Sequence, residues 1–365
     1  MNAPGGEGGV GLADDFREDD ARKEPSLVVV KGRPFNAETP LEALRADVTP
    51  SALHYVRCNF DIPRLSPETH RLSVGGEVDR PLSLSMEALA SLPRRTLTVT
   101  LECAGNNRLD FTPLPPGEPW ERGAVGTSTW AGVPLREVLA RAGVRPGAVE
   151  ILAEGADGGT VRGADVPLSF ARALPREVAF HEDTLLALEM NGEPLTPEHG
   201  APVRLLVPGW YAMASVKWLS RLSALTQPFH GHFQTERYVY DGDGRTEPVQ
   251  RMRVKALLVS PAEGAAVRAG APFTVQGQAW SGEGPVVRVE VAVDGEDWRE
   301  AELLGEPSPY AWRAFRCELA PLEPGRHTLR CRATDEKGNV QPDAPPWNRL
   351  GYGNNAVRPV VIHAR

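Results

Sequence analysis

The chain has 365 residues, 41% hydrophobic and 24% charged, an ordinary balance for a globular protein large enough for two domains. Its formal net charge of −8 argues against a nucleic-acid-binding surface. Because the sequence holds no run of about 18 apolar residues, it predicts no membrane span. The acidic, glycine-rich start lacks the apolar core of a secretory signal, so we expect a disordered tail at residues 1–38 and a cytoplasmic protein.

Residues 39–250 are predicted to form a domain of short helices and strands. A capping box that begins at Thr39 starts a short helix. Leucines and valines alternate with threonines over residues 95–102, which is the period of a strand. Leu135 begins an amphipathic helix that Gly143 closes. Because these elements follow no regular β-α-β rhythm, the expected fold class is α+β.

After residue 250 the helical signals vanish, and short strands follow about every ten residues. Residues 251–365 are therefore predicted to form an all-β sandwich. Cys317 and Cys331 lie on the apolar faces of two of these strands and are expected to be cross-strand neighbours in its core. A cytoplasmic location favours reduced packing residues over a disulfide, and the sequence leaves the pairing open.

Cys103 lies where the predicted strand 95–102 runs into a turn of glycine and asparagine. The period of two puts its side chain on the apolar face, so it can be a small core residue, which is the common place for a free cysteine. It can also be a thiolate ligand for a metal, because Arg108 follows closely and a cation favours the thiolate. The residue pattern alone favours a core position for Cys103, and the role of a metal ligand stays open.

Several cationic residues accompany Cys103 at the ends of other strand-like runs, where sites are usually built. They are Arg57, Arg108, Arg162, His199, Arg204 and Lys217. Taken singly, each is more typical of a surface position than of a site. The chain has no hydrolase motif and no Cys-x-x-Cys-His, so it is expected to bring no haem of its own. Pattern alone thus reaches a thiol near cationic loops, which suits an anionic ligand.

These segments resemble the sulfite oxidase family. The segment around Cys103, TLECAGNNR, is similar to the one whose cysteine binds molybdenum in that family. Other segments of the family's oxidoreductase domain resemble YVRCNFDIP, TWAGVPLREVLARAG and MNGEPLTPEHGAPVRLLVPGWYAMASVKWL of this chain. The family's immunoglobulin-like dimerisation domain resembles GQAWSGEGPVVRVEVAVDGEDWREAEL, RATDEKGNVQP and WNRLGYGNN. The likeness covers roughly residues 40–365 in the family's order.

The resemblance implies a molybdenum–molybdopterin cofactor, with Cys103 as the protein ligand of the metal. It places eight further residues around the pterin and its phosphate: Tyr55, Arg57, Asn59, Asp157, His199, Arg204, Ser215 and Lys217. Arginine, lysine and histidine suit this role because they donate to a phosphate. The expected catalytic residues are Arg57, Arg108 and Arg162, which would orient an oxyanion beside the metal.

Two positions depart from the family's pattern. Arg162 stands where sulfite oxidases have an active-site tyrosine, so a permanent cation replaces a phenol. Asn59 stands where many members have a histidine that contacts the pterin. An added arginine should strengthen anion binding. Because Arg162 departs from the family's pattern, the resemblance supports the assignment of the metal ligand more strongly than the assignment of sulfite as the substrate.

The function expected is that of a molybdenum-cofactor oxidoreductase of sulfite oxidase type. Oxygen-atom transfer would turn sulfite into sulfate, and the electrons would pass to a separate acceptor such as a cytochrome. The resemblance also implies a homodimer formed through the C-terminal domain. The alternatives are a reductase of an S-oxide or N-oxide on the same scaffold, and a non-catalytic protein for cofactor binding or assembly.

Overall fold

The computed structural model describes residues 27–161, 165–242 and 245–365. The described chain is mostly strand, and its three α-helices are short: α1 (Met86–Ala90), α2 (Leu135–Ala142) and α3 (Arg176–Ala179). None of its helices is long and apolar enough to cross a membrane. The α+β expectation is thus confirmed only in part, because helices contribute less than the sequence predicts.

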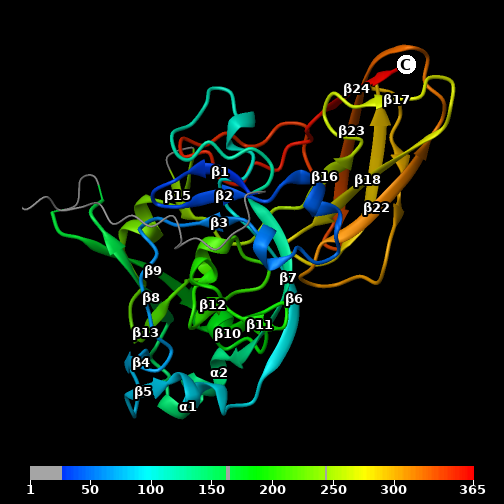
Figure 1. Cartoon of the computed structure of the whole chain (residues 1–365). Coiled ribbons are helices and arrows are strands. Elements are labelled where there is room, and N and C mark those ends of the chain that lie inside the picture. The colour runs from blue at the N-terminus through cyan, green and yellow to red at the C-terminus, as the bar shows by residue number, and fades with distance from the viewer. Residues whose placement is uncertain (1–26, 162–164, 243–244) are drawn as a thin grey trace, which may run out of the picture.

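The chain before residue 250 forms three sheets and a hairpin (Figure 1). The first sheet contains β11 (Glu193–Pro194), β10 (Leu185–Met190), β7 (Val125–Pro134) and β6 (Arg95–Glu102), and β12 (Arg204–Leu206) pairs with β10. The second contains β5 (Leu82–Ser85), β4 (Arg71–Gly76), β13 (Leu219–Leu225), β8 (Glu150–Gly159) and β9 (Leu168–Pro175). The third contains β1 (Val28–Lys31), β2 (Asn36–Glu38) and β3 (Val56–Arg57), and β14 (Val239–Gly242) pairs with β15 (Arg245–Pro248).

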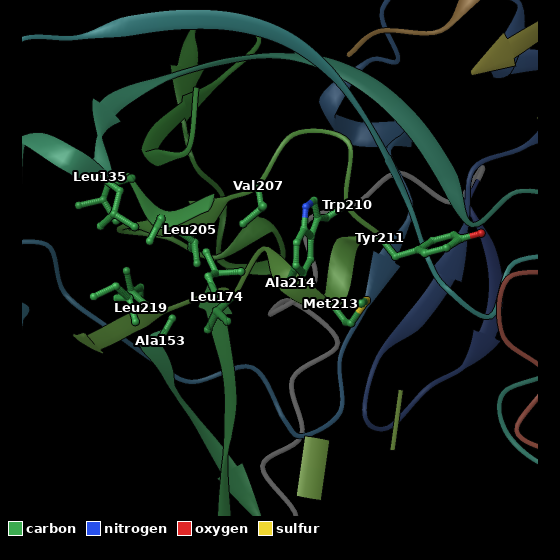
Figure 2. Close-up of a cluster of buried hydrophobic side chains, with 14 of the residues drawn as sticks. Leu135, Ala153, Leu174, Leu205, Val207, Trp210, Tyr211, Met213, Ala214 and Leu219 are labelled. Carbon is green, nitrogen blue, oxygen red and sulfur yellow. The ribbon is translucent and has the colours of Figure 1, made fainter. Parts of the chain in front are cut away.

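A hydrophobic core lies among these sheets and holds the loops between them in place. Figure 2 shows Leu135 of α2, Leu205 of β12 and Leu219 of β13 directed toward one another. All three are fully buried, so each contributes about 1.5–3 kcal/mol through removal from water. Gly143 closes α2 with a φ of 69°, as the sequence predicts. Anchored strands thereby fix the direction in which the connecting loops leave them.

The helix predicted from Thr39 is present only as a single 3-10 turn, Leu41–Arg45. Thr39 does not cap it, so the capping box is wrong. The Thr39 hydroxyl donates instead to Val125 O at 3.1 Å and accepts from Tyr55 N at 3.0 Å. The buried Thr39 side chain thus satisfies backbone groups at the start of β7 and just before β3 in preference to a helix end.

Strand β6 is confirmed, but its second half is buried on both faces. Val99 and Leu101 pack with Trp120 and Trp130, as the alternating pattern requires. The opposite face carries Thr100 and Glu102, which are also buried, at 0% and 1% exposure. The C-terminal part of the chain covers this face, because Trp312 N donates to Thr100 Oγ1 at 2.7 Å.

The C-terminal part is a sandwich of two sheets, as predicted. One sheet contains β16 (Lys255–Ser260), β18 (Phe273–Trp280), β22 (Arg313–Leu319) and β21 (Glu302–Leu303). The other contains β17 (Ala266–Val267), β24 (Val360–Ala364), β23 (Gly325–Asp335), β19 (Val286–Val293) and β20 (Arg299–Glu300). Residues of both sheets form a single apolar cluster between them.

Cys317 and Cys331 are both free and buried in this cluster, which confirms them as packing residues. They are not cross-strand neighbours, however. Cys317 on β22 pairs with Val275, whereas Cys331 on β23 belongs to the other sheet and pairs with Val291. The connection 320–324 therefore crosses from one sheet to the other and does not form a hairpin.

Candidate functional site

One cavity brings together every residue that the sequence predicts to contact the cofactor. Its walls include Tyr55, Arg57, Asn59, Cys103, Asp157, His199, Arg204, Ser215 and Lys217. These residues come from β3, the end of β6, β8, the turn before β12, β12 itself and the segment before β13. Four stretches that are distant in the sequence, residues 55–59, Cys103, Asp157 and residues 199–217, therefore converge on one space.

Cys103 follows directly on β6 and presents its thiol to this cavity with 5% exposure. Its backbone N donates to Ala124 O at 2.8 Å, and the chain then turns through Asn107, whose φ is 64°. Burial raises the pKa of the Cys103 thiol, while the nearby Arg57 guanidinium opposes that rise. A cation that entered the cavity would favour the thiolate further, so Cys103 is suited to bind a metal.

Arg204 and Lys217 give the cavity a buried positive charge. Arg204 donates to His199 O at 3.1 Å and to Ser215 O at 3.0 Å, and burial lowers its pKa to about 10. Lys217 Nζ donates to Glu198 O at 2.8 Å and lies 3.2 Å from Cys58 Sγ. Burial also lowers the pKa of Lys217. Because backbone carbonyls hold these cations, much of their charge is available to an anion.

Two buried polar atoms in the cavity wall lack a hydrogen-bond partner within the described part of the chain. They are Oδ1 of Asp157, a residue that is 5% exposed, and Nε of Arg204, which is 4% exposed. Leaving such groups unpaired costs about 1–3 kcal/mol each. A ligand with N–H donors and an anionic group would satisfy both. The cations, the thiol and these two atoms together fit a molybdopterin-type cofactor.

The metal at such a site would need ligands beyond the protein. Among the described residues, no group of three or more His, Cys, Asp or Glu side chains is arranged to hold a metal ion. Cys103 would therefore be joined by sulfur or oxygen atoms of the cofactor. This matches the single protein ligand that the resemblance implies.

Arg108, a predicted catalytic residue, does not line the cavity. Its guanidinium donates to Glu118 O at 2.9 Å and to Leu350 O at 3.2 and 3.3 Å, and it lies 5.1 Å from the ring of Tyr352. Tyr352 stacks on Tyr238, which does line the cavity. Arg108 thus contacts the site through two rings. The catalytic role of Arg162 lies outside the described residues.

Glycines from three segments surround the Arg108 guanidinium. A Cβ atom built on Gly105 would lie 2.6 Å from Arg108 Nη1, and one on Gly117 would lie 3.0 Å from its Cζ. At Gly351 a Cβ atom would lie 3.2 Å from Nε. The side chain of Arg108 therefore fills a space that exists only because three neighbours have no side chain.

Sequence reasoning missed several residues of the cavity wall, among them Cys58, Phe170, Glu198, Met213 and Tyr238. Cys58 could have been found, because it lies between the named Arg57 and Asn59. Tyr238 carries no signal in the sequence, and only the fold shows that its hydroxyl donates to Asn59 Oδ1 at 3.2 Å.

Comparisons with known proteins agree with this geometry. Residues 59–233 match the oxidoreductase molybdopterin binding domain, and residues 246–365 match the Mo-co oxidoreductase dimerisation domain. Mitochondrial sulfite oxidase of Mus musculus is 39% identical over 377 residues, which cover 96% of this chain and 68% of the mouse protein. The chain belongs to the sulfite oxidase family. As the sequence predicts, it is an enzyme of the molybdopterin-dependent oxidoreductase type.

Other proteins match over a similar share of this chain. The nitrate reductase [NADH] of Spinacia oleracea is 34% identical over 94% of this chain and 41% of the plant protein. The crystal structure of the sulfane dehydrogenase SoxCD from Paracoccus pantotrophus superimposes with a TM-score of 0.81 and 31% identity. That alignment covers 92% of this chain and 88% of the solved one.

Asp157 gives the cofactor-free protein a testable dependence of stability on pH. Burial raises the pKa of Asp157 from 3.8 to about 6, and Lys217 opposes the rise. The folded state therefore binds this proton more tightly than the unfolded state. Its contribution to the free energy of unfolding falls by about 2 kcal/mol as pH rises from about 4 to about 7. Asp157→Asn should remove this loss, so its stability relative to the wild type should increase over the same range.

Urea unfolding of the cofactor-free protein at both pH values measures this difference. Asp297→Asn, which removes an exposed carboxylate, is the matched control and should show no such change. An Asp157→Asn protein whose stability relative to the wild type is the same at both pH values would contradict the prediction.

Proposed function

We propose that the chain oxidises sulfite to sulfate with a molybdenum–molybdopterin cofactor and passes two electrons to a separate acceptor. Sulfite gains one oxygen atom from water in the overall reaction and loses two electrons, and two protons are released. The observation that carries the proposal is the convergence of Cys103 and the cationic residues on one cavity, in a family with sulfite oxidases. A bound cofactor would supply the oxygen-atom transfer and the two-electron chemistry.

The proposed roles of the side chains follow from their chemistry. Cys103 binds the metal as a thiolate, which neighbouring cations favour. Arg204 and Lys217 bind the cofactor's phosphate, and Asp157 accepts from a pterin N–H through its unpaired Oδ1. Arg57 donates to Asn59 Oδ1 at 2.7 Å, to Asn36 Oδ1 at 3.3 Å and to Cys58 O, which hold its guanidinium in the cavity wall. The charge of this fixed guanidinium would orient the oxyanion.

We propose that residues 39–250 form the molybdopterin-binding domain and that residues 251–365 form an immunoglobulin-like domain that joins two copies of the chain. The match to a dimerisation domain supports this division, as do the two packed sheets of the sandwich. Sedimentation at micromolar concentration should give a dimer, and a single species of monomer mass would contradict the proposal.

The cytoplasmic location and the absence of haem stay predictions.

A second candidate is a reductase of an S-oxide or N-oxide on the same scaffold. The likeness to a nitrate reductase favours it, because that relative is named for a reduction. The direction of turnover separates the two functions. A protein that oxidises sulfite with ferricyanide but does not reduce sulfoxides with a reduced dye acts in the proposed direction.

Metal content and sulfite turnover test the proposed function together. The purified wild type from a host that makes the cofactor should contain molybdenum and pterin and should reduce ferricyanide with sulfite. Cys103→Ser should lower molybdenum content and turnover to background, because a hydroxyl replaces the thiolate ligand. Cys317→Ser is the matched control, since that cysteine lies in the sandwich core. A wild type without molybdenum and pterin would favour the non-catalytic alternative.

Substitution of Arg162 tests the substrate. The resemblance implies that the cation of Arg162 faces the substrate. Arg162→Tyr should then raise the KM for sulfite by about tenfold or more, because hydrogen bonds to charged groups contribute about 1.5–3 kcal/mol. Arg162→Lys retains the charge and serves as the control. Steady-state kinetics with sulfite measure the change. If Arg162→Tyr oxidises sulfite and the wild type does not, the natural substrate is a compound other than sulfite.

A further inference from the structure

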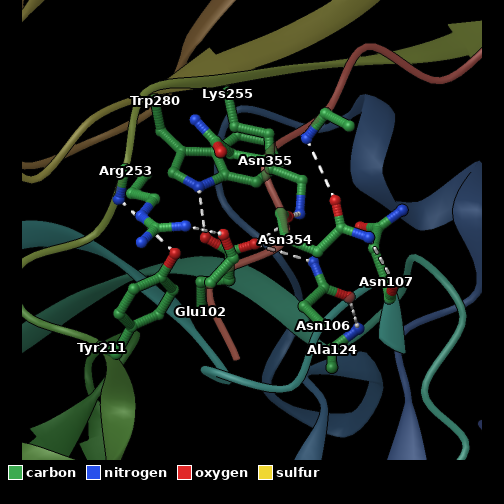
Figure 3. A network of polar contacts seen from close by, with 12 residues as sticks. Glu102, Asn106, Asn107, Ala124, Tyr211, Arg253, Lys255, Trp280, Asn354 and Asn355 are labelled. Carbon is green, nitrogen blue, oxygen red and sulfur yellow. Dashed lines mark hydrogen bonds and ion pairs between the residues drawn. The ribbon is translucent and has the colours of Figure 1, made fainter. Parts of the chain in front are cut away.

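Residues of the C-terminal sandwich bind the carboxylate of Glu102, the residue that directly precedes Cys103 (Figure 3). Glu102 is 1% exposed, and its Oε1 lies 2.8 Å from Lys255 Nζ of β16. Its Oε2 accepts from Trp280 Nε1 of β18 at 2.9 Å. Asn106 Nδ2 donates to Oε1 at 3.0 Å, so three donors fix both oxygens of the carboxylate.

The sandwich part of the chain also holds the turn on the other side of Cys103. Gly353 N donates to Ala104 O at 2.8 Å, and Asn354 Nδ2 donates to Asn107 O at 2.9 Å. Lys255 Nζ connects the two sets of contacts, because it also donates to Asn354 O at 2.9 Å. The segment 102–107 is thus bound from both ends by residues that follow residue 250.

Because Glu102 is the last residue of a strand, the contacts that fix its carboxylate also restrict the direction of the next side chain, that of Cys103. Successive side chains of a strand point to opposite faces. Cys103 directly follows β6, and the bond from its N to Ala124 O continues the ladder. Its side chain packs in the same cluster as Leu101, on the face opposite to Glu102. A carboxylate that is fixed on one face therefore fixes the direction of the thiol on the other. A buried ion pair is weak evidence for stability, since its desolvation offsets the attraction. Its better attested effect is to select one geometry.

We propose that Lys255 and Trp280 are positioning residues for the metal ligand Cys103. The sandwich would then complete the metal site in addition to joining two copies of the chain. The inference rests on the proposed function, because it requires that Cys103 bind molybdenum. It differs from that function in naming residues that lie outside the cavity and contact neither cofactor nor substrate.

Two tryptophans of the sandwich offer a matched pair of variants. Trp312 lies 6.5 Å from Trp280 between ring centroids, and its Nε1 donates to Asp47 O at 2.9 Å. Trp280→Phe and Trp312→Phe each remove one indole N–H bond to the N-terminal part of the chain, a buried one for Trp280 and a part-buried one for Trp312. Only Trp280→Phe removes a bond to Glu102.

Two readouts follow the position of Cys103 without a turnover assay. In the cofactor-free protein, Trp280→Phe should speed amide hydrogen exchange over residues 103–108 by about fivefold, the effect of one lost hydrogen bond. In the loaded protein, it should shift the electron paramagnetic resonance signal of partly reduced molybdenum. Trp312→Phe should leave both readouts at the wild-type value. Lys255→Met should change both readouts in the same direction as Trp280→Phe. Lys255→Arg retains the positive charge, so it should change both readouts less than Lys255→Met does.

The outcomes separate this inference from the proposed function. A wild type without a molybdenum signal overturns the proposed function. A wild-type signal that Trp280→Phe leaves unchanged overturns the inference alone, as does a Trp312→Phe that changes the signal equally. Unchanged exchange over residues 103–108 in Trp280→Phe overturns it as well. If Lys255→Met does not fold, the pair of tryptophan variants decides.

Discussion

The structure depends on how the polar face of β6 is covered. Thr100 and Glu102 point away from the apolar core of their own sheet, yet neither is exposed. Buried polar groups must find partners, and besides Thr127 and Asn106 the partners here include Trp312 and Lys255 from beyond residue 250. The two parts of the chain therefore meet through specific hydrogen bonds and an ion pair, and the strand that ends at Cys103 is the shared element.

The cavity follows a second physical constraint, which is the cost of burying cations. Arg204 and Lys217 are held mainly by backbone carbonyls and lie against aromatic rings, 5.0 Å from Trp130 and 4.2 Å from Trp218 respectively. Carbonyl groups and ring faces stabilise a cation without cancelling its charge. Three cationic side chains, Arg57, Arg204 and Lys217, thereby line the cavity, and the carboxyl groups of Asp157 and Glu198 in the same wall offset their charge only in part.

The sequence predicted the elements that depend on local pattern. The strand that ends at Cys103 shows in its period of two, and the helix before Gly143 shows in its period and its closing glycine. The nine cofactor residues could be named only through their resemblance to a family, because their spacing in the sequence gives no distance in space. The structure adds that they surround one cavity.

What the sequence could not predict depends on pairing between distant segments. Cys317 and Cys331 share an apolar face in the pattern, but which sheet each joins is decided by strand pairing along the whole sandwich. Thr39 has a good capping sequence, yet a burial site between two strands satisfies its hydroxyl. The sequence predicts that Arg108 orients the substrate, but its guanidinium donates to the backbone O of Leu350, which lies 242 residues later in the chain.

The glycines around Arg108 have a consequence for how this protein can change over evolution. Gly105, Gly117 and Gly351 belong to three separate segments, and each leaves room for the same guanidinium. A methyl group at Gly105 would lie 2.6 Å from Nη1 and would force the guanidinium to shift, whereas a smaller residue at 108 would leave a void among the three glycines. Substitutions at these four positions are therefore expected to be coupled, so the effect on stability of a change at one depends on the residues at the others.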